Sequence, residues 1–193
     1  MSVADTISFR SLGRSDFSLL QGWLAARHVA VWWNERFDAE SLEAKYGPGI
    51  DGREPIHVYL IQNESVPIGW IQWYRWRDFK EHADRLGADL CSAGIDLAIG
   101  EIQMTGRGIG PVVIREFGAN YIFTNVEICA IVADPAMKNL RSVRAFQKAD
   151  FKIVNTVRPG RLSNSIRPSC RLTKSCATAN PSPVPSDRPV TKG

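Results

Sequence analysis

Alternating apolar and polar positions predict the strands of this 193-residue chain. The predicted strands cover residues 7–10, 57–62, 67–76, 95–99, 126–133 and 151–154. Only four residues separate the second strand from the third, which predicts a β-hairpin. In the longer hairpin strand, the alternation puts Trp70, Gln72 and Tyr74 on one face and Ile71 and Trp73 on the other.

Apolar residues spaced three and four apart predict helices between these strands. Ser15-Asp16 offers an N-cap to the first helix, and Gly47-Pro48-Gly49 is expected to end the second. The polar stretch 77–93 is predicted to be a long loop or a short helix, either a solvated run of charges or a segment that shapes a binding site. The predicted helices cover residues 17–24, 38–46, 111–117 and 139–151.

The stretch from Arg27 to Trp33 is dense in aromatic residues. Adjacent residues of a strand point to opposite faces, so Trp32 and Trp33 cannot both enter one core from a strand. At least one of them is therefore expected to face a cleft or a neighbouring loop. Two partly buried packing residues in a loop are the alternative.

A glycine-rich loop, Gly106-Arg107-Gly108-Ile109-Gly110, follows the strand at 95–99, and Pro111 then suits a first helical turn. Bare backbone N–H groups at the positive end of a helix attract phosphate oxygens. The loop lacks the lysine of a Walker A motif and the full GxGxxG spacing of a dinucleotide site. Spacing alone leaves two interpretations, a phosphate-binding loop and a tight turn.

Two polar residues lie in otherwise apolar strands. An acid such as Asp96 on a short central strand is costly unless it is paired or functional, so it is either a catalytic carboxylate or a structural one held by backbone donors. Gln72 lies among aromatic residues and is either a polar contact in a pocket or a plain surface residue.

The net charge of +4 is unevenly distributed. Residues 156–193 carry seven basic residues and one acidic residue, a net +6, which leaves −2 on residues 1–155. An acidic body suits a cationic small-molecule substrate and argues against nucleic acid as the main partner. The basic Pro/Ser-rich tail, 156–193, is predicted to be largely disordered, with weak, salt-sensitive contact to nucleic acid as an alternative. Few large apolar residues lie between Arg158 and Lys174, so a last strand looks poorly encoded.

The four cysteines show no metal-ligand spacing, and a chain of this size does not need disulfides, so free thiols and no metal are expected. No long apolar run or signal-like segment is present, which predicts a cytoplasmic protein without a membrane partner. The sequence does not distinguish a monomer from a homodimer.

The segment TGRGIG resembles the pyrophosphate loop of the GNAT superfamily of acetyl-CoA-dependent N-acyltransferases. The pattern there is Arg or Gln, two residues, Gly, one residue, and Gly or Ala, and Thr105 stands where Arg or Gln is expected. The order of elements over residues 7–155 is also similar to the GNAT order. The resemblance implies an α/β (α+β) GNAT domain, with a mixed central sheet splayed at the acetyl-CoA site and helices on both faces.

Four blocks, in order, resemble aminoglycoside 6'-N-acetyltransferases: WLAARHVAVWW, PIGWIQWY, GID followed by GRGIG, and DPAMKNLRSVRAFQKADF. The resemblance implies transfer of an acetyl group from acetyl-CoA, without a metal, to a primary amine such as the 6'-amino group of an aminoglycoside. One alternative is another amine, such as a hydroxylysine-type siderophore precursor. A catalytically weak coenzyme-binding protein is the other.

The resemblance also implies roles for individual residues. Asp96 is the acid that meets the amine. The family tyrosine proposed as general acid is replaced by Phe146, and Arg158-Pro159-Gly160 reverses the charge of an acidic turn. The residues expected to line the acceptor pocket are Trp33, Tyr46, Glu54, Gln72, Asp96 and Asp134. The residues expected to hold the coenzyme are Ile102, Gln103, Gly106, Arg107, Gly108, Ile109, Gly110 and Asn139.

Overall fold

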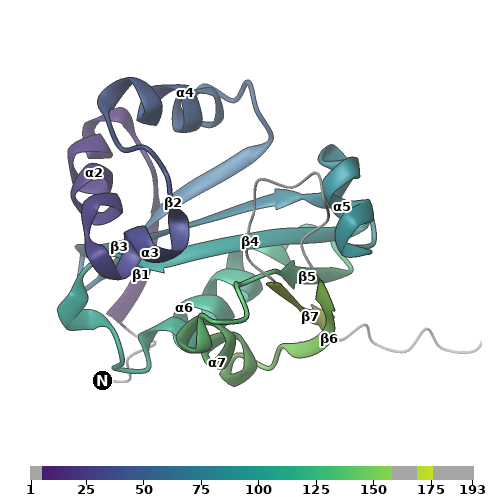
Figure 1. Ribbon diagram of the computed structural model, residues 1–193. Coiled ribbons are helices and arrows are strands. Elements are labelled where there is room, and N and C mark those ends of the chain that lie inside the picture. The colour runs from purple at the N-terminus through teal and green to yellow at the C-terminus, as the bar shows by residue number, and fades with distance from the viewer. Residues whose placement is uncertain (1–5, 158–168, 176–193) are drawn as a thin grey trace, which may run out of the picture.

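The computed structural model describes residues 6–157 and 169–175, which contain one seven-stranded sheet (Figure 1). Its strands lie in the order β1-β2-β3-β4-β5-β7-β6, and the β4–β5 pair is parallel while the other pairs are antiparallel. The sheet is therefore mixed, as expected. The strands are β1 (Ile7–Ser11), β2 (Ile56–Asn63), β3 (Val66–Arg75), β4 (Ser92–Ile99), β5 (Ala130–Ala133), β6 (Lys152–Val157) and β7 (Ser169–Ser175).

Helices cover both faces of the sheet, with α2, α3 and α4 on one face and α6 and α7 on the other (Figure 1). The alternation of β3 serves both cores, because Trp70 packs with the first group and Ile71 and Trp73 pack with the second. None of the described helices is long and apolar enough to cross a membrane. The helices are α2 (Phe17–Ala25), α3 (Arg27–Trp33), α4 (Ala39–Ile50), α5 (Lys80–Leu86), α6 (Ile109–Phe117) and α7 (Leu140–Lys148).

The aromatic-rich stretch from Arg27 to Trp33 forms the helix α3, which was not among the predicted helices. Ala26 is extended, with φ −66° and ψ 127°, and this residue separates α3 from α2. Asn34 ends α3 in the left-handed conformation, with φ 47°. Successive helical residues point about 100° apart, so both tryptophans of α3 border one cavity, described below.

The helix α4 also differs from the prediction, because it continues through Gly47-Pro48-Gly49 to Ile50. Arg14 binds Glu43, before the glycines, through contacts of 2.7–3.1 Å, and Asp51, after them, at 2.8 and 2.9 Å. These ion pairs fix the chain on both sides of the expected break. Tertiary contacts therefore override the local preference for a stop.

The strand β5 begins at Ala130, four residues later than predicted. Asn125 directs the preceding segment into a turn, since its side-chain oxygen accepts from the Glu127 N–H and its carbonyl accepts from the Ile128 N–H. Val126 is consequently 98% exposed.

The C-terminal strand β7 lies between β5 and β6 and pairs antiparallel with both. The sequence predicted this last pairing to be poorly encoded, because large apolar residues are few. An inner strand is held by backbone hydrogen bonds along both edges, so it does not depend on large side chains alone. Residues 169–175 therefore belong to the sheet. The expectation of disorder for 158–168 and 176–193 lies outside the described residues.

The hairpin turn between β2 and β3 contains Glu64 and Ser65, both in the left-handed region with φ 49° and 67°. Two such residues in succession favour Asn-Gly. We expect the double variant Glu64→Asn, Ser65→Gly to unfold at a higher temperature, with a gain of about 1 kcal/mol. Calorimetry of the variant and of Ser2→Gly, a change far from the turn in sequence, measures the effect. A lower melting temperature for the double variant would contradict the assignment.

Candidate active site

A cavity of about 720 Å³ lies where the two parallel strands separate. β4 pairs with β5 only through Ser92–Gly94 and Ala130–Val132, while β4 itself continues to Ile99. The cavity is lined by Leu97, Ala98 and Ile99 of β4, by α3 from one face of the sheet, and by α6 and α7 from the other. The cavity therefore extends from one face of the sheet to the other, at the end of β4 that is not paired with β5.

The glycine loop forms one end of this cavity. Gly106 and Gly108 have φ values of 75° and 79°, which disfavour any side chain, and a Cβ on either would meet no atom within 4 Å. Gly108 is the N-cap of α6, so the first N–H groups of that helix have no partner within the helix. Gly106, Gly108, Ile109 and Gly110 line the cavity, whereas the exposed Arg107 is not part of its lining.

The two left-handed glycines also change how the loop is matched to the expected pattern. Gly110 lies within α6, so Gly106 and Gly108 are the pair in the loop. The pattern requires two residues before Gly106, and Met104 and Thr105 fill those places, so Gln103, rather than Thr105, stands at the Arg-or-Gln position. The Thr105 hydroxyl instead donates to the Ile102 carbonyl at 2.8 Å. The pattern is then complete, and no side chain is missing from it.

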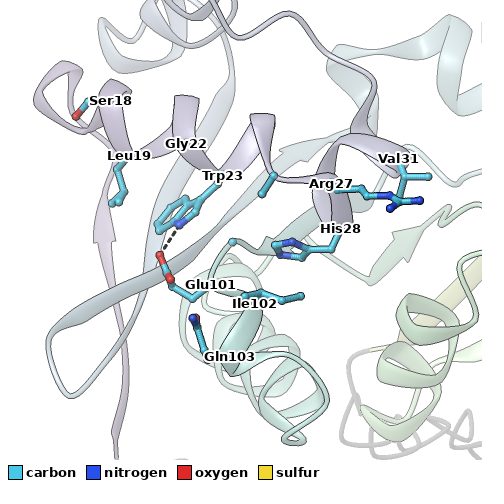
Figure 2. Close-up of a pocket in the computed structure, with 12 residues that line it drawn as sticks. Ser18, Leu19, Gly22, Trp23, Arg27, His28, Val31, Glu101, Ile102 and Gln103 are labelled. Carbon is cyan, nitrogen blue, oxygen red and sulfur yellow. Dashed lines mark hydrogen bonds between the residues drawn. The ribbon is translucent and has the colours of Figure 1, made fainter.

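Ile102 and Gln103 line a second, more open cavity of about 810 Å³ (Figure 2). Its wall includes Trp23, whose indole N–H donates to Glu101 Oε1 at 2.8 Å. The Trp23 ring covers Gly100, where a Cβ would overlap it. The expected coenzyme residues are thus divided between two cavities, which share the α3 residues His28 and Val31.

Asn139 also lines the first cavity, and its side-chain oxygen caps α7 by accepting from the Ser142 N–H at 3.2 Å. Phe146 lies on the same wall, 3% exposed, with its ring centroid 5.1 Å from that of Phe151. Among the described residues, no group of three or more His, Cys, Asp or Glu could hold a metal ion.

The carboxylate of Asp96 lies beside the amide of Gln72, the residue opposite it on β3. Gln72 Nε2 donates to Asp96 Oδ2 at 3.1 Å, and Gln72 is buried, which excludes the plain surface role for this residue. Burial, followed by repulsion from Asp134, raises the pKa of Asp96 to about 6, while Gln72, Lys45 and His82 act in the opposite direction. This carboxylate can therefore exchange a proton near neutral pH.

Tyr74 and His82 also lie near Asp96, and neither was predicted as a site residue. The Tyr74 ring packs over Gly94, where a Cβ would overlap it. Burial and the charges of Asp96 and Asp134 raise the pKa of Tyr74 well above its ordinary value. His82 Nε2 lies 3.8 Å from Asp134 Oδ2. The strand alternation that selected Gln72 could have indicated Tyr74, but the polar stretch containing His82 carries no such pattern.

Aromatic residues and the ion pair between Lys45 and Glu35 lie near the carboxylate of Asp96. Tyr46 is buried, and its hydroxyl donates to Glu35 Oε2 at 3.4 Å. Burial, then the charges of Glu35 and Asp96, raise the pKa of Tyr46. Trp33, which also borders the first cavity, has its ring centroid 5.0 Å from that of Trp70. The contacts around Asp96 do not include Glu54, which is exposed between α4 and β2.

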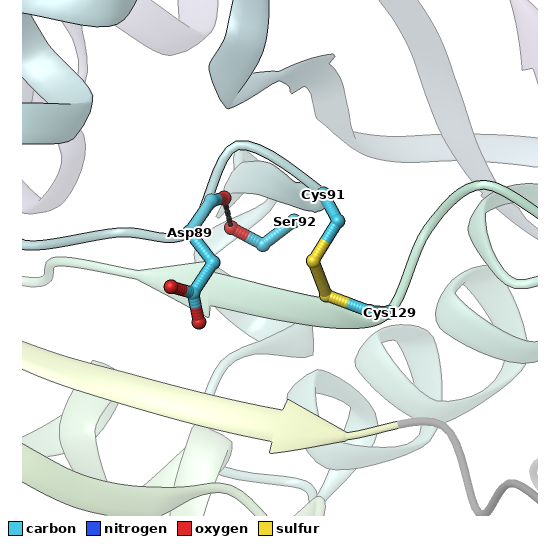
Figure 3. The surroundings of a disulfide bond; sticks show 4 residues. All are labelled: Asp89, Cys91, Ser92 and Cys129. Carbon is cyan, nitrogen blue, oxygen red and sulfur yellow. Dashed lines mark hydrogen bonds between the residues drawn. A yellow bond between two sulfur atoms is a disulfide. The ribbon is translucent and has the colours of Figure 1, made fainter.

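A disulfide between Cys91 and Cys129 lies at the paired ends of β4 and β5 (Figure 3). The parallel register aligns Ser92 with Ala130, so the two preceding cysteines come together with a Cα–Cα distance of 5.5 Å. The expectation of free thiols was therefore wrong for this pair. The two cysteines are 38 positions apart in the sequence, and the strand pairing brings them together. The expectation of free thiols for Cys170 and Cys176 lies outside the side chains that the structure describes.

The arrangement combines an anion-attracting loop, a cavity through the splayed sheet and a carboxylate that titrates near neutral pH, which suits acyl transfer from a phosphate-bearing donor to an amine. The sequence profile of the acetyltransferase (GNAT) domain matches residues 13–158. The aminoglycoside N(6')-acetyltransferase type 1 of Klebsiella pneumoniae is 26% identical over 156 residues, which cover 79% of this chain and 77% of that protein.

Solved structures give the same fold. Aminoglycoside acetyltransferase AAC(6')-Ib in complex with coenzyme A superposes with a TM-score of 0.73 and 24% identity, covering 88% of this chain and 95% of that one. Spermidine N-acetyltransferase from Vibrio cholerae, in complex with CoA and spermine, superposes with a TM-score of 0.68 and 16% identity, covering 89% and 96%. The fold is thus shared with acetyltransferases whose structures hold coenzyme A, in one case together with spermine.

Proposed function

We propose that this chain, which belongs to the acetyltransferase (GNAT) domain family, transfers the acetyl group of acetyl-CoA to a primary amine of a polycationic acceptor, with the 6'-amino group of an aminoglycoside as the preferred target. The chain is an acetyl-CoA-dependent N-acetyltransferase. The observation that carries the choice of acceptor is the position of Asp96, a carboxylate with a raised pKa among aromatic and acidic side chains. We also propose that it acts in the cytoplasm, as a monomer or a homodimer.

The coenzyme occupies the cavity between β4 and β5. The N–H groups of the glycine loop and of the first turn of α6 bind the pyrophosphate, because these donors have no partner in the helix. The pantetheine arm passes along the free edge of β4 at Leu97, Ala98 and Ile99, opposite Asn139. This edge presents backbone donors to the thioester.

The acceptor approaches from the α3 and α4 face, where Asp96 lies. Asp96 takes a proton from the acceptor ammonium, and the neutral nitrogen attacks the thioester carbonyl. The C–N bond forms, the C–S bond breaks, and the nitrogen releases its surplus proton to solvent as it becomes the amide. The thiolate of coenzyme A leaves and takes a proton from solvent. Phe146 cannot supply that proton because it has no hydroxyl. A thiolate is a tolerable leaving group, so this substitution slows turnover without abolishing it.

The pH dependence of transfer follows from the raised pKa of Asp96. The ionised form is the base, so kcat/KM is expected to rise with pH through about 6 and to fall about tenfold per pH unit below it. The hydrogen bond from Gln72 lowers the pKa of Asp96, so Gln72→Leu should move this limb to higher pH. Rates measured from pH 5 to 9 test this, and a limb that stays in place in Gln72→Leu would contradict it.

Release of coenzyme A thiol in the presence of kanamycin, spermidine, hydroxylysine and a simple primary amine tests the proposed acceptor. Transfer to kanamycin with a kcat/KM at least tenfold above the others supports the aminoglycoside. Preference for hydroxylysine supports the alternative of a siderophore-type precursor. Binding of acetyl-CoA without transfer to any amine supports a catalytically weak coenzyme-binding protein, the alternative that Phe146 favours.

A further inference from the structure

The ammonium group of Lys45 lies in a cage of aromatic and acidic side chains beside Asp96. Its Nζ is 5.5 Å from the centre of the Trp33 ring and 5.4 Å from that of Tyr46, and it forms an ion pair with Glu35. Both ring distances lie within the range of cation–π attraction. Glu35 also accepts a hydrogen bond from Tyr46, so one carboxylate contacts both the cation and a ring of the cage.

The cage is built by the end of α3 and the middle of α4. Trp33 is the last residue of α3, and the left-handed Asn34 turns the chain so that Glu35 reaches α4. Lys45 and Tyr46 are neighbours on α4. Trp33 joins the cage to the coenzyme cavity, and the charge of Lys45 acts directly on the pKa of Asp96.

Two aromatic faces and a carboxylate are the chemistry that binds an ammonium ion. The acceptors considered above carry several such groups, and here the chain supplies one of its own. The Lys45 side chain is 40% exposed, so it can swing into water and lose only an ion pair that solvent already weakens. The cation in the cage is therefore replaceable.

We propose that Lys45 is a specificity-determining residue that fills a second ammonium subsite until an acceptor with two or more amino groups displaces it. The inference rests on the proposed function. While one amine of the acceptor meets Asp96, a second enters the cage of Trp33, Tyr46 and Glu35. A monoamine has no second ammonium group to place in the cage. Lys45 therefore remains there, and the affinity for the monoamine is not increased.

The variant Lys45→Met keeps the length of the side chain and removes its charge. Lys152→Met, at an exposed position on β6, is the matched control. At pH 8, where Asp96 is ionised, we expect Lys45→Met to lower KM for 1,3-diaminopropane about fivefold, with little change for propylamine. The control should behave as the unmodified protein. An unchanged or raised KM for the diamine in Lys45→Met would overturn the inference.

A binding measurement separates this inference from the proposed function. Tetramethylammonium cannot be acetylated, and its binding can be followed by titration calorimetry, which does not depend on Trp33 as a reporter. Lys45→Met should bind it about fivefold more tightly than the unmodified protein, and Trp33→Ala in the same background should cancel the gain. Equal affinity in Lys45→Met and the unmodified protein would overturn the inference even where amine acetylation is observed. Tighter binding without acetylation of any amine would uphold the cage and reject the proposed reaction.

Discussion

Asp96→Asn is expected to lower kcat/KM for acetyl transfer by a factor of about 10² to 10⁴, because the variant cannot accept a proton from the acceptor ammonium. The change is nearly isosteric, and the new side-chain oxygen can still accept the hydrogen bond from Gln72. Acetyl-CoA binding should persist, since the glycine loop and the edge of β4 are untouched. Calorimetric titration with acetyl-CoA and rates with kanamycin at pH 8 measure the two effects separately.

The same variant also tests how Asp96 affects the stability of the fold. Burial and Asp134 raise the pKa of Asp96 from 3.8 to about 6, so the stability of the fold falls as pH rises between these values and stays lowered at higher pH. Asp96→Asn should therefore melt at an equal or higher temperature than the unmodified protein at pH 8. Unchanged turnover would remove Asp96 from the mechanism, and a large loss of stability would instead assign it a structural role.

Loss of the disulfide is expected to destabilise the fold by about 3 kcal/mol, because the bond closes a long loop in the unfolded chain. The sequence separation of 38 residues puts this link in the range where the entropic effect is substantial. Cys91→Ser and Cys129→Ser should give the same loss, and the double variant no more than either one. Both cysteines are exposed, so a reductant should produce the same shift in the unmodified protein.

Urea unfolding with and without dithiothreitol measures this effect, and Cys176→Ser, outside the described residues, is the control for a cysteine not in the pair. Insensitivity of the unmodified protein to the reductant, together with four titratable thiols, would contradict the pairing. The result also bears on the proposed cytoplasmic location, because a reducing cytoplasm keeps such cysteines as thiols. In the cytoplasm the enzyme would therefore work without the disulfide, at the lower stability of the reduced protein.

The sequence predicted the sheet well where side chains alternate and poorly where tertiary contacts decide. The faces of β3 and the strand–loop–helix around Gly106 and Gly108 followed from local patterns, because strand alternation and glycine conformation are local properties. The continuation of α4 past Gly47 depends on Arg14, which is distant in sequence. The Cys91–Cys129 pair depends on strand register, which no spacing rule contains.

The residues of the candidate site also fall into those that a local pattern indicates and those that tertiary contacts bring in. Asp96 and Gln72 could be selected because polar residues in apolar strands are conspicuous, and the structure brings them together. The surroundings of Asp96 include Lys45 and His82, which come from a helix surface and a polar stretch without a recognisable pattern. Their effect on Asp96 arises from the positions that α4 and α5 take in the assembled fold, which no local pattern contains.

The short helix α3 forms a wall of both cavities, through His28 and Val31. His28 also bonds the end of β4, with its Nε2 3.1 Å from the Ile99 carbonyl oxygen. Two ligands that require different positions of α3 would therefore bind the two cavities with linked affinities, and by reciprocity each would alter the affinity of the other by the same factor.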